Sequence, residues 1–226
     1  MLEEKARREA RNKIRSFYPD AGAYRRELYT KHLEFFAAGK EHNERAFLAG
    51  NRVGKTIAGA YEMASHMTGV YAGWWPGIQF DMPVHCWCSG DTAKTTRDLM
   101  QKQLLGPPGD VSAMGTGMLP GDMILRTAPK HGLADAFESV HVRHVSGGVS
   151  TLHFKSYDQG REAFQGDACH VIWLDEESEM AIYTECLLRT MTTGGIVYLT
   201  ASPLRGLTEL MLSFLPHLQP TAQENE

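Results

Sequence analysis

One segment of the sequence has the residue types and spacing of a phosphate-binding loop: A-G-N-R-V-G-K-T, residues 49–56. Its last three residues match the pattern G-x-x-x-x-G-K-[ST], whereas an alanine replaces the first glycine and a glycine follows it directly. In such loops backbone N–H groups wrap a phosphate, the lysine reaches the β- and γ-phosphates, and the hydroxyl binds Mg²⁺. We therefore predict that ATP and Mg²⁺ bind here, through Gly50, Asn51, Arg52, Val53, Gly54, Lys55 and Thr56.

Carboxylates follow an apolar run at residues 170–177, H-V-I-W-L-D-E-E. Such a run is typical of a strand buried on both faces of a sheet, whose carboxyl end would lie beside the phosphate loop. We predict that Asp175 binds Mg²⁺ and that Glu176 is the general base that polarises the attacking water. Glu177 is interpreted as a charge at the start of the next helix, and the same explanation remains open for all three acids.

A third segment, I-V-Y-L-T-A-S-P at residues 196–203, is a predicted strand that runs into small hydroxyl residues. Thr200 or Ser202 would be able to hydrogen-bond the γ-phosphate or the attacking water and so report its presence. The alternative is that a Thr-x-Ser-Pro segment simply ends a strand.

Helix and strand patterns alternate along the chain, which predicts an α/β fold with a mainly parallel central sheet flanked by helices. A strand and a hairpin separate the two nucleotide motifs. This order favours a P-loop NTPase of the additional-strand, glutamate-base type, and hydrolysis over phosphoryl transfer to a small acceptor. The predicted helices span residues 1–16, 24–38 (apolar stripe Leu28, Leu33, Phe35, Phe36), 55–67 and 92–105, the last capped by Asp91 or Thr92. The predicted strands span 46–49, 82–88, 170–174 and 196–199, with a hairpin of 139–145 and 149–155 and a loop over 106–121.

Composition and charge argue against several classes of protein. The 226 residues carry 23 basic and 27 acidic side chains, and the net charge of −4 disfavours a purely electrostatic DNA-coating protein. The sequence has no apolar run of membrane-spanning length, and its charged beginning lacks the core of a signal peptide. The four cysteines are predicted to be reduced, with Cys86 and Cys88 buried on one face of a strand rather than binding a metal.

Four blocks in this order resemble the ATPase domain of tailed-phage large terminase subunits: AGNRVGKT, SYDQGREAFQG, VIWLDEE and LTASPLRGLTEL. These subunits are the motors that pump double-stranded DNA into the empty capsid, and the resemblance covers roughly residues 28–212. It implies that Lys55 and Thr56 bind phosphate and Mg²⁺, that Asp175 binds Mg²⁺, and that Glu176 is the base. It also implies a coupling motif made of Thr200, Ala201, Ser202 and Pro203.

The resemblance implies two further groups of nucleotide contacts. A basic residue inside the loop would assist catalysis, and Arg52 is the candidate, although many family members carry the arginine where this chain has Asn51. Family members also hold adenine with an aromatic or glutamine-bearing segment upstream of the loop. Tyr29, His32 and Phe36 fall in that segment, but it has no glutamine, and core aromatics of an amphipathic helix are the equal alternative.

The expected organisation is an N-terminal helical extension over residues 1–27, an ATPase domain over 28–215 and a C-terminal tail over 216–226. After Pro203 the only acidic residues are Glu209, Glu224 and Glu226, so we expect no two-metal nuclease domain in this chain. The partners implied by the resemblance are double-stranded DNA, a portal protein, a small terminase subunit and further copies of the chain in a ring on the capsid. The implied location is the host cytoplasm, transiently at the procapsid portal, without a membrane.

Two other functions remain as alternatives. A helicase-like, nucleic-acid-dependent ATPase would share the phosphate loop and the Asp-Glu pair, but it needs a second motor lobe for which this chain has no room. A non-catalytic nucleotide-binding module would share the loop alone, and Glu176 argues against it.

Overall fold

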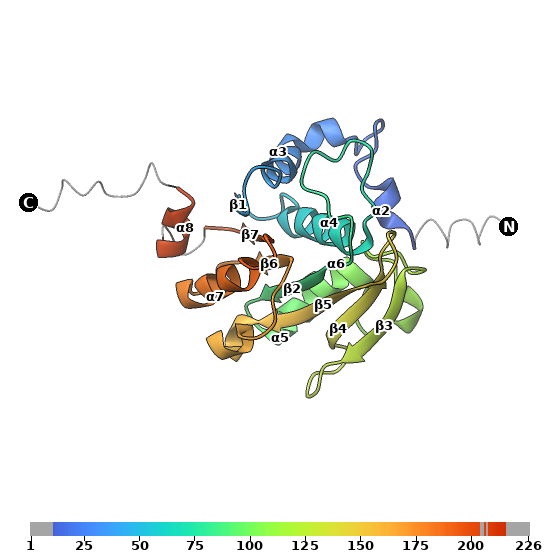
Figure 1. Ribbon diagram of the computed structural model, residues 1–226. Coiled ribbons are helices and arrows are strands. Elements are labelled where there is room, and N and C mark those ends of the chain that lie inside the picture. Colours follow the sequence, from blue (N-terminus) through green and yellow to red (C-terminus); the bar gives the residue numbers. More distant parts are fainter. Residues whose placement is uncertain (1–10, 204–205, 207, 216–226) are drawn as a thin grey trace, which may run out of the picture.

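The computed structural model describes residues 11–203, 206 and 208–215, which fold around a seven-stranded sheet (Figure 1). The strand order is β1-β7-β6-β2-β5-β4-β3. In this order the first five strands, β1, β7, β6, β2 and β5, are parallel to their neighbours. Strand β4 pairs with both β5 and β3 in antiparallel fashion. The mainly parallel α/β sheet predicted from the sequence is confirmed. The strands are β1 (Glu44–Leu48), β2 (His85–Gly90), β3 (Ile124–Pro129), β4 (Phe137–Arg143), β5 (Val149–Ser156), β6 (Val171–Asp175) and β7 (Ile196–Ala201).

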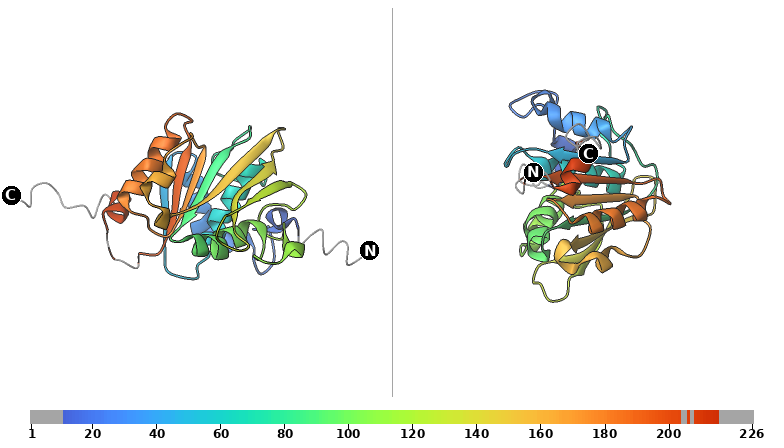
Figure 2. Two further views of the ribbon diagram at one scale, coloured as in Figure 1. Left: turned by 90° about the horizontal axis from the view of Figure 1, so that it is seen from below. Right: turned by 90° about the vertical axis from the view of Figure 1, so that its left-hand side faces the viewer.

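Helices cover both faces of the sheet and divide its apolar side chains into two cores (Figure 1). On one face α3 (Thr30–Ala38), α4 (Lys55–Thr68) and α6 (Lys102–Leu105) enclose the larger core. On the other face α7 (Met180–Thr190) and α8 (Glu209–Ser213) enclose the smaller one. Figure 2 (left) shows α7 at the β6–β7 end of the sheet, with β5, β4 and β3 extending away from it. None of the described helices has the length and apolar character needed to cross a membrane.

The N-terminal segment contributes buried side chains to the larger core. The short helix α2 (Lys13–Ser16) contributes Ile14, and Tyr18 is 3% exposed in the same cluster. Residues 1–10 of the predicted first helix and the predicted tail lie outside the described residues. Cys86 and Cys88 are buried in this core as predicted, and all four cysteines are free thiols.

Two predicted helices differ in detail from the structure. The helix predicted over residues 24–38 begins with a 3-10 turn, η1 (Arg26–Tyr29), and this change of winding leaves Leu28 exposed while Phe35 and Phe36 are buried. The helix predicted over 92–105 is capped by Thr92, but it consists of α5 (Ala93–Thr95), a π-helical segment η2 (Thr96–Gln101) and α6. Three further short 3-10 helices are described: η3 (Val111–Ala113), η4 (Tyr157–Gln159) and η5 (Arg161–Phe164).

Strand β3 is an element that the sequence did not reveal. Its burial pattern shows no alternation, because only part of it packs against the core. Its pairing with β4 is also irregular: the register shifts between Ile124 and Arg126 and again between Ala128 and Pro129.

The position of α4, which begins at the phosphate loop, depends on a close approach to β6. A Cβ atom at Gly59 would lie 2.5–2.7 Å from the indole ring of Trp173, which is completely buried on β6. On the same turn the Tyr198 hydroxyl donates to the Gly59 carbonyl at 2.9 Å, which ties the helix to β7. Only glycine therefore fits at this point of the contact between α4 and the large side chain of Trp173.

A buried ion pair fixes α4 relative to β1. The Arg45 guanidinium on β1 pairs with the Glu62 carboxylate on α4, and both side chains are at most 5% exposed. The guanidinium also lies 4.8 Å from the centre of the Phe35 ring and 5.3 Å from that of Tyr198. Burial alone would raise the pKa of Glu62, but Arg45 and the neighbouring His66 hold it below its usual value. The loop between β1 and α4 is thus anchored on both sides.

We expect Gly59→Ala to lower the free energy of unfolding by about 1–2 kcal/mol, because overpacking against Trp173 outweighs the ~1 kcal/mol by which alanine favours a helix. Urea unfolding followed by tryptophan fluorescence measures the change. Gly73→Ala is the control, since a Cβ there meets no atom within 4 Å. A Gly59→Ala protein as stable as the control would show that α4 does not need the close approach.

Candidate nucleotide site

The phosphate loop connects β1 to α4 at the carboxyl edge of the parallel strands. Gly54 precedes α4 with a φ of 87°, and Arg52 has a φ of 64°, so two residues of the loop are left-handed. Within the described part of the chain, none of the backbone N–H groups of residues 51–56 donates a hydrogen bond. A row of free N–H groups at the start of a long helix suits an anion such as a phosphate.

The Lys55 ammonium lies across the loop. It donates to the carbonyl oxygens of Ala49 at 2.9 Å and Gly50 at 2.7 Å, and to the Ser202 hydroxyl at 2.9 Å. The Ser202 hydroxyl in turn donates to the side-chain oxygen of Asn51 at 2.8 Å. Lys55 therefore joins the loop to the segment that follows β7.

A hydroxyl and a carboxylate form the donor set that fits a magnesium ion. The Thr56 hydroxyl lies 3.2 and 3.3 Å from the two carboxylate oxygens of Asp175, which is 3% exposed at the end of β6. Burial raises the pKa of Asp175 to about 6, while the Thr200 and Thr56 hydroxyls and the Lys55 ammonium act in the opposite direction. Hard oxygen donors of this kind are the ligands that Mg²⁺ prefers. No cluster of three or more His, Cys, Asp or Glu side chains suited to a metal is found among the described residues.

Glu176 has a strained backbone that the surrounding strands hold in place. Its φ is 60°, a left-handed conformation that is unfavourable for a residue with a side chain. Its N–H donates to the Thr200 carbonyl at 2.9 Å, and its carboxylate accepts from the Ser202 N–H at 3.1 Å. The residue predicted to be the base is thus oriented by the end of β7.

The predicted coupling motif divides into residues that face the site and residues that support it. The Thr200 hydroxyl is fully buried, donates to Asp175 at 2.5 Å and accepts from the Trp173 indole N–H at 2.8 Å. It orients the Asp175 carboxylate, which leaves Ser202 as the hydroxyl that contacts the loop. Ala201 is buried and its carbonyl accepts from the Ala49 N–H at 3.2 Å, whereas Pro203 is exposed.

Glu177 corrects one expectation. The sequence pattern places it at the start of the following helix, but α7 begins only at Met180, after the N-cap residue Glu179. The Glu177 carboxylate instead accepts a hydrogen bond from the Thr208 hydroxyl, and Thr208 is the N-cap residue of α8.

The aromatic segment upstream of the phosphate loop contacts the loop through a histidine. Nε2 of His32 bonds the Val53 carbonyl at 2.9 Å, and Nδ1 bonds the Tyr18 hydroxyl at 2.6 Å. Burial lowers the pKa of His32, so the ring is neutral: Nε2–H donates to Val53 and Nδ1 accepts from Tyr18. Phe36 is a core residue with no exposed surface. Tyr29 is half-buried against His32, and its contact with adenine stays a prediction.

Two residues of the site were missed in the sequence. Tyr18 precedes every recognised motif, so no pattern pointed to its bond with His32. Tyr157 belongs to the SYDQGREAFQG block, whose sequence alone does not single out the tyrosine, and its hydroxyl lies against the backbone of Asp175 and Glu176. Arg52 is exposed, and its side chain makes no hydrogen bond or ion pair with another described residue.

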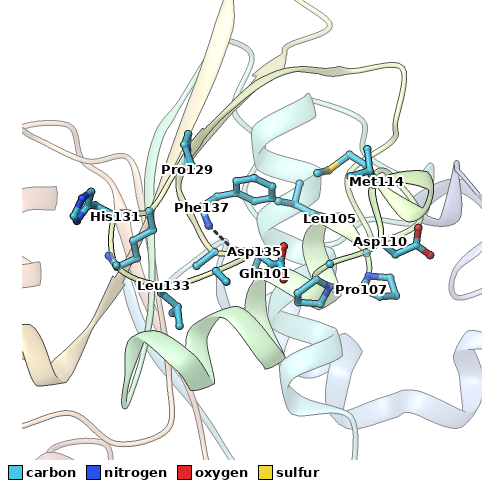
Figure 3. Close-up of a pocket in the computed structure, with 18 residues that line it drawn as sticks. Gln101, Leu105, Pro107, Asp110, Met114, Pro129, His131, Leu133, Asp135 and Phe137 are labelled. Carbon is cyan, nitrogen blue, oxygen red and sulfur yellow. Dashed lines mark hydrogen bonds between the residues drawn. The ribbon is translucent and has the colours of Figure 1, made fainter.

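A cavity of about 730 Å³ lies at the other end of the sheet, between the loop after α6 and the connection from β3 to β4 (Figure 3). Gln101 bridges its floor, donating to the Asp135 carbonyl at 2.7 Å and accepting from the Phe137 N–H at 2.9 Å. The cavity shares no residue with the phosphate loop or with the Asp175–Glu176 pair.

Comparison with known proteins identifies the family of the chain. The family described as "Terminase large subunit, T4likevirus-type, N-terminal" matches residues 46–224. The chain belongs to the terminase large subunit family. The large terminase subunit of Salmonella phage P22 is 35% identical over 204 residues, which cover 83% of this chain and 41% of that protein. This terminase chain thus spans less than half the length of its P22 relative.

Solved terminase structures show the same fold. The large terminase of a thermophilic bacteriophage superposes with a TM-score of 0.54 at 13% identity, over 84% of this chain and 42% of its own. A second structure of that phage's large terminase, in complex with ADP, gives a TM-score of 0.51 at 15% identity, over 84% and 41% of the two chains. The resemblance to terminases and the P-loop NTPase fold are both confirmed.

The raised pKa of Asp175 predicts a pH-dependent stability in the absence of nucleotide and Mg²⁺. Because the pKa is about 6 in the folded protein and 3.8 when unperturbed, folding favours the neutral carboxyl, and stability is lost as the pH rises from the unperturbed value through 6. We expect Asp175→Asn to escape this loss, so its melting temperature should rise relative to wild type between about pH 4 and pH 7.

The size of that effect is on the order of 2–3 kcal/mol over this range of pH. Asp122→Asn, at an exposed position, is the control and should show no such trend. A difference in melting temperature between Asp175→Asn and wild type that does not change with pH would contradict the assignment of the titration to Asp175.

Proposed function

We propose that this chain is the ATP-hydrolysing domain of a phage DNA-packaging terminase, with the domain spanning residues 28–215. The observation that carries the proposal is the contact of Thr56 with Asp175, which joins the phosphate loop to the strand that ends in Glu176. Membership of the terminase large subunit family and the ADP complex of the thermophilic phage's large terminase support it.

Each residue of the site has a chemical role in this proposal. The free N–H groups of residues 51–56 and the Lys55 ammonium bind the phosphates, and Thr56 and Asp175 hold Mg²⁺. The Mg²⁺ held there would neutralise negative charge on the phosphates. The Glu176 carboxylate orients the attacking water and accepts its proton. The Ser202 hydroxyl, which accepts a hydrogen bond from Lys55, senses the γ-phosphate. Arg52 supplies further positive charge from within the loop.

The wider role proposed for the chain follows from its family. Hydrolysis would power translocation of double-stranded DNA into the procapsid, in a ring of copies docked on the portal protein and loaded by the small terminase subunit, within the host cytoplasm. The match covers 41% of the P22 protein, so we propose these partners for the whole terminase of which this chain would be the ATPase part.

The test of catalysis compares two adjacent acids. Glu176→Gln preserves shape and hydrogen bonding but cannot accept a proton, so we expect it to bind ATP–Mg²⁺ and to hydrolyse it at least ~10²-fold more slowly. Glu177→Gln should retain wild-type turnover, because the Glu177 carboxylate accepts from Thr208 at the start of α8 and not from a residue of the phosphate loop. Phosphate release measures both.

The reverse pattern, with loss of turnover in Glu177→Gln alone, would show that Glu176 is not the base. A wild-type protein that binds ATP–Mg²⁺ without releasing phosphate under any condition would favour the non-catalytic module instead.

An arginine from a neighbouring copy is proposed to complete the site. Three arginines outside the loop are candidates: Arg97, Arg126 and Arg143. Arg97 pairs with Asp98 at 2.8 Å and donates to the Ala134 carbonyl at 2.8 Å. The Arg126 and Arg143 side chains are exposed and make no hydrogen bond or ion pair with another described residue, so they are the better candidates.

The isolated chain should therefore be a weak ATPase whose turnover per subunit rises with protein concentration, since an arginine supplied by a neighbour can be worth ~10³–10⁵ in rate. Phosphate release measured across a dilution series, alongside sedimentation to determine oligomeric state, tests this. Fast turnover by a monomer at every concentration would contradict the neighbour's arginine and favour Arg52 in its place.

A further inference from the structure

The Tyr157 hydroxyl lies at a junction of three backbone carbonyls. Tyr157 directly follows β5, and its hydroxyl is 3.2 Å from the Ser89 oxygen on β2, 3.1 Å from the Asp175 oxygen and 3.1 Å from the Glu176 oxygen. Burial raises the pKa of this phenol well above its usual value, so it keeps its hydrogen and can donate. The Tyr157 ring lies 6.4 Å from that of Phe164 in the smaller core, which holds the hydroxyl in place.

This junction coincides with the strained residue of the site. Glu176 is left-handed, and for a residue with a Cβ that conformation persists only where neighbouring groups impose it. Its N–H is held by the Thr200 carbonyl and its carboxylate by the Ser202 N–H, both from the end of β7. Its carbonyl is one of the three backbone carbonyls that share the single Tyr157 O–H. Removing the hydroxyl would free one end of the peptide unit that sets the direction of the Glu176 side chain.

We propose that Tyr157 is a positioning residue: its hydroxyl holds the left-handed backbone of Glu176 and so aims the carboxylate at the water that attacks the γ-phosphate. This inference rests on the proposed function, because it requires Glu176 to be the base. The 3-10 turn η4, which contains Tyr157, is itself bound to the residue after β2: the Asp158 N–H donates to the Asp91 carbonyl at 3.1 Å. The base is thereby fixed from the hairpin side of the sheet as well as from β7.

The decisive experiment measures ATP hydrolysis by Tyr157→Phe in the full chain. This change keeps the ring and removes only the donor, so we expect kcat to fall by ~3–10-fold, the range expected for one lost hydrogen bond. KM for ATP and the Mg²⁺ concentration for half-maximal rate should stay within ~twofold of wild type, because Tyr157 contacts only the backbone of Asp175, whose carboxylate keeps its hydrogen bonds from Thr56 and Thr200.

A double-mutant comparison separates positioning from general structural support. In the Glu176→Gln background no base remains to be aimed, so adding Tyr157→Phe should change the residual rate by less than ~twofold. Tyr183→Phe is the matched control. Tyr183 belongs to the same core, but its hydroxyl donates to Glu44 at 2.7 Å, away from the phosphate loop. Removing that hydroxyl should leave kcat unchanged.

Two results would overturn the inference: a wild-type kcat in Tyr157→Phe, or an equal loss of rate in the Glu176→Gln background. Replacing Tyr157 by 4-aminophenylalanine provides a second variant that keeps a donor at the same place. Turnover within ~twofold of wild type in that protein supports the inference, and a tenfold loss contradicts it, even if Tyr157→Phe does not fold. If wild type and Glu176→Gln release phosphate equally, the proposed function itself fails, whatever Tyr157→Phe does.

Discussion

The buried carboxylate of Asp175 is the point on which the rest of the site depends. A carboxylate with 3% exposure is costly to ionise unless hydrogen bonds or a cation compensate, and three neighbours offset part of that cost. Thr56 comes from the start of α4, Thr200 from β7 and Lys55 from the phosphate loop. The hydrogen bonds and the ammonium around this one carboxyl therefore join the ends of two strands and one helix, and the remaining groups of the site are arranged around them.

The strand order gives this arrangement its geometry. Because β1, β7 and β6 are parallel neighbours, their carboxyl ends lie side by side, and each contributes a different group. The loop after β1 supplies N–H groups and the lysine, β6 supplies the two acids, and the end of β7 supplies Thr200 and Ser202. Gly59 and the Arg45–Glu62 pair then hold α4 close enough to the sheet for Thr56 to reach Asp175.

Sequence patterns predicted the parts of this site that are local in the chain. The loop, the buried strand with its acids and the final strand were placed correctly, because each is defined by a short run of residues with a characteristic spacing or an unbroken apolar stretch. What could not be predicted depends on contacts between distant segments. The bond from Thr200 to Asp175 and the bond from His32 to Val53 are examples, since each requires knowing which elements are neighbours. The irregular strand β3 and the π-helical segment lack a regular period, so no pattern could reveal them.

The irregular pairing of β3 affects how copies of this protein can meet in solution. An outermost strand offers unpaired backbone groups on which a second molecule can add a strand, and this is a common route to aggregation. Here the regular register with β4 is confined to Arg126–Ala128, the strand ends in a proline that has no N–H to donate, and Arg126 is exposed. These features oppose the growth of a continuous sheet from one molecule to the next. Contacts between copies on this side must then be made by side chains and loops, which can form and separate without unravelling a strand.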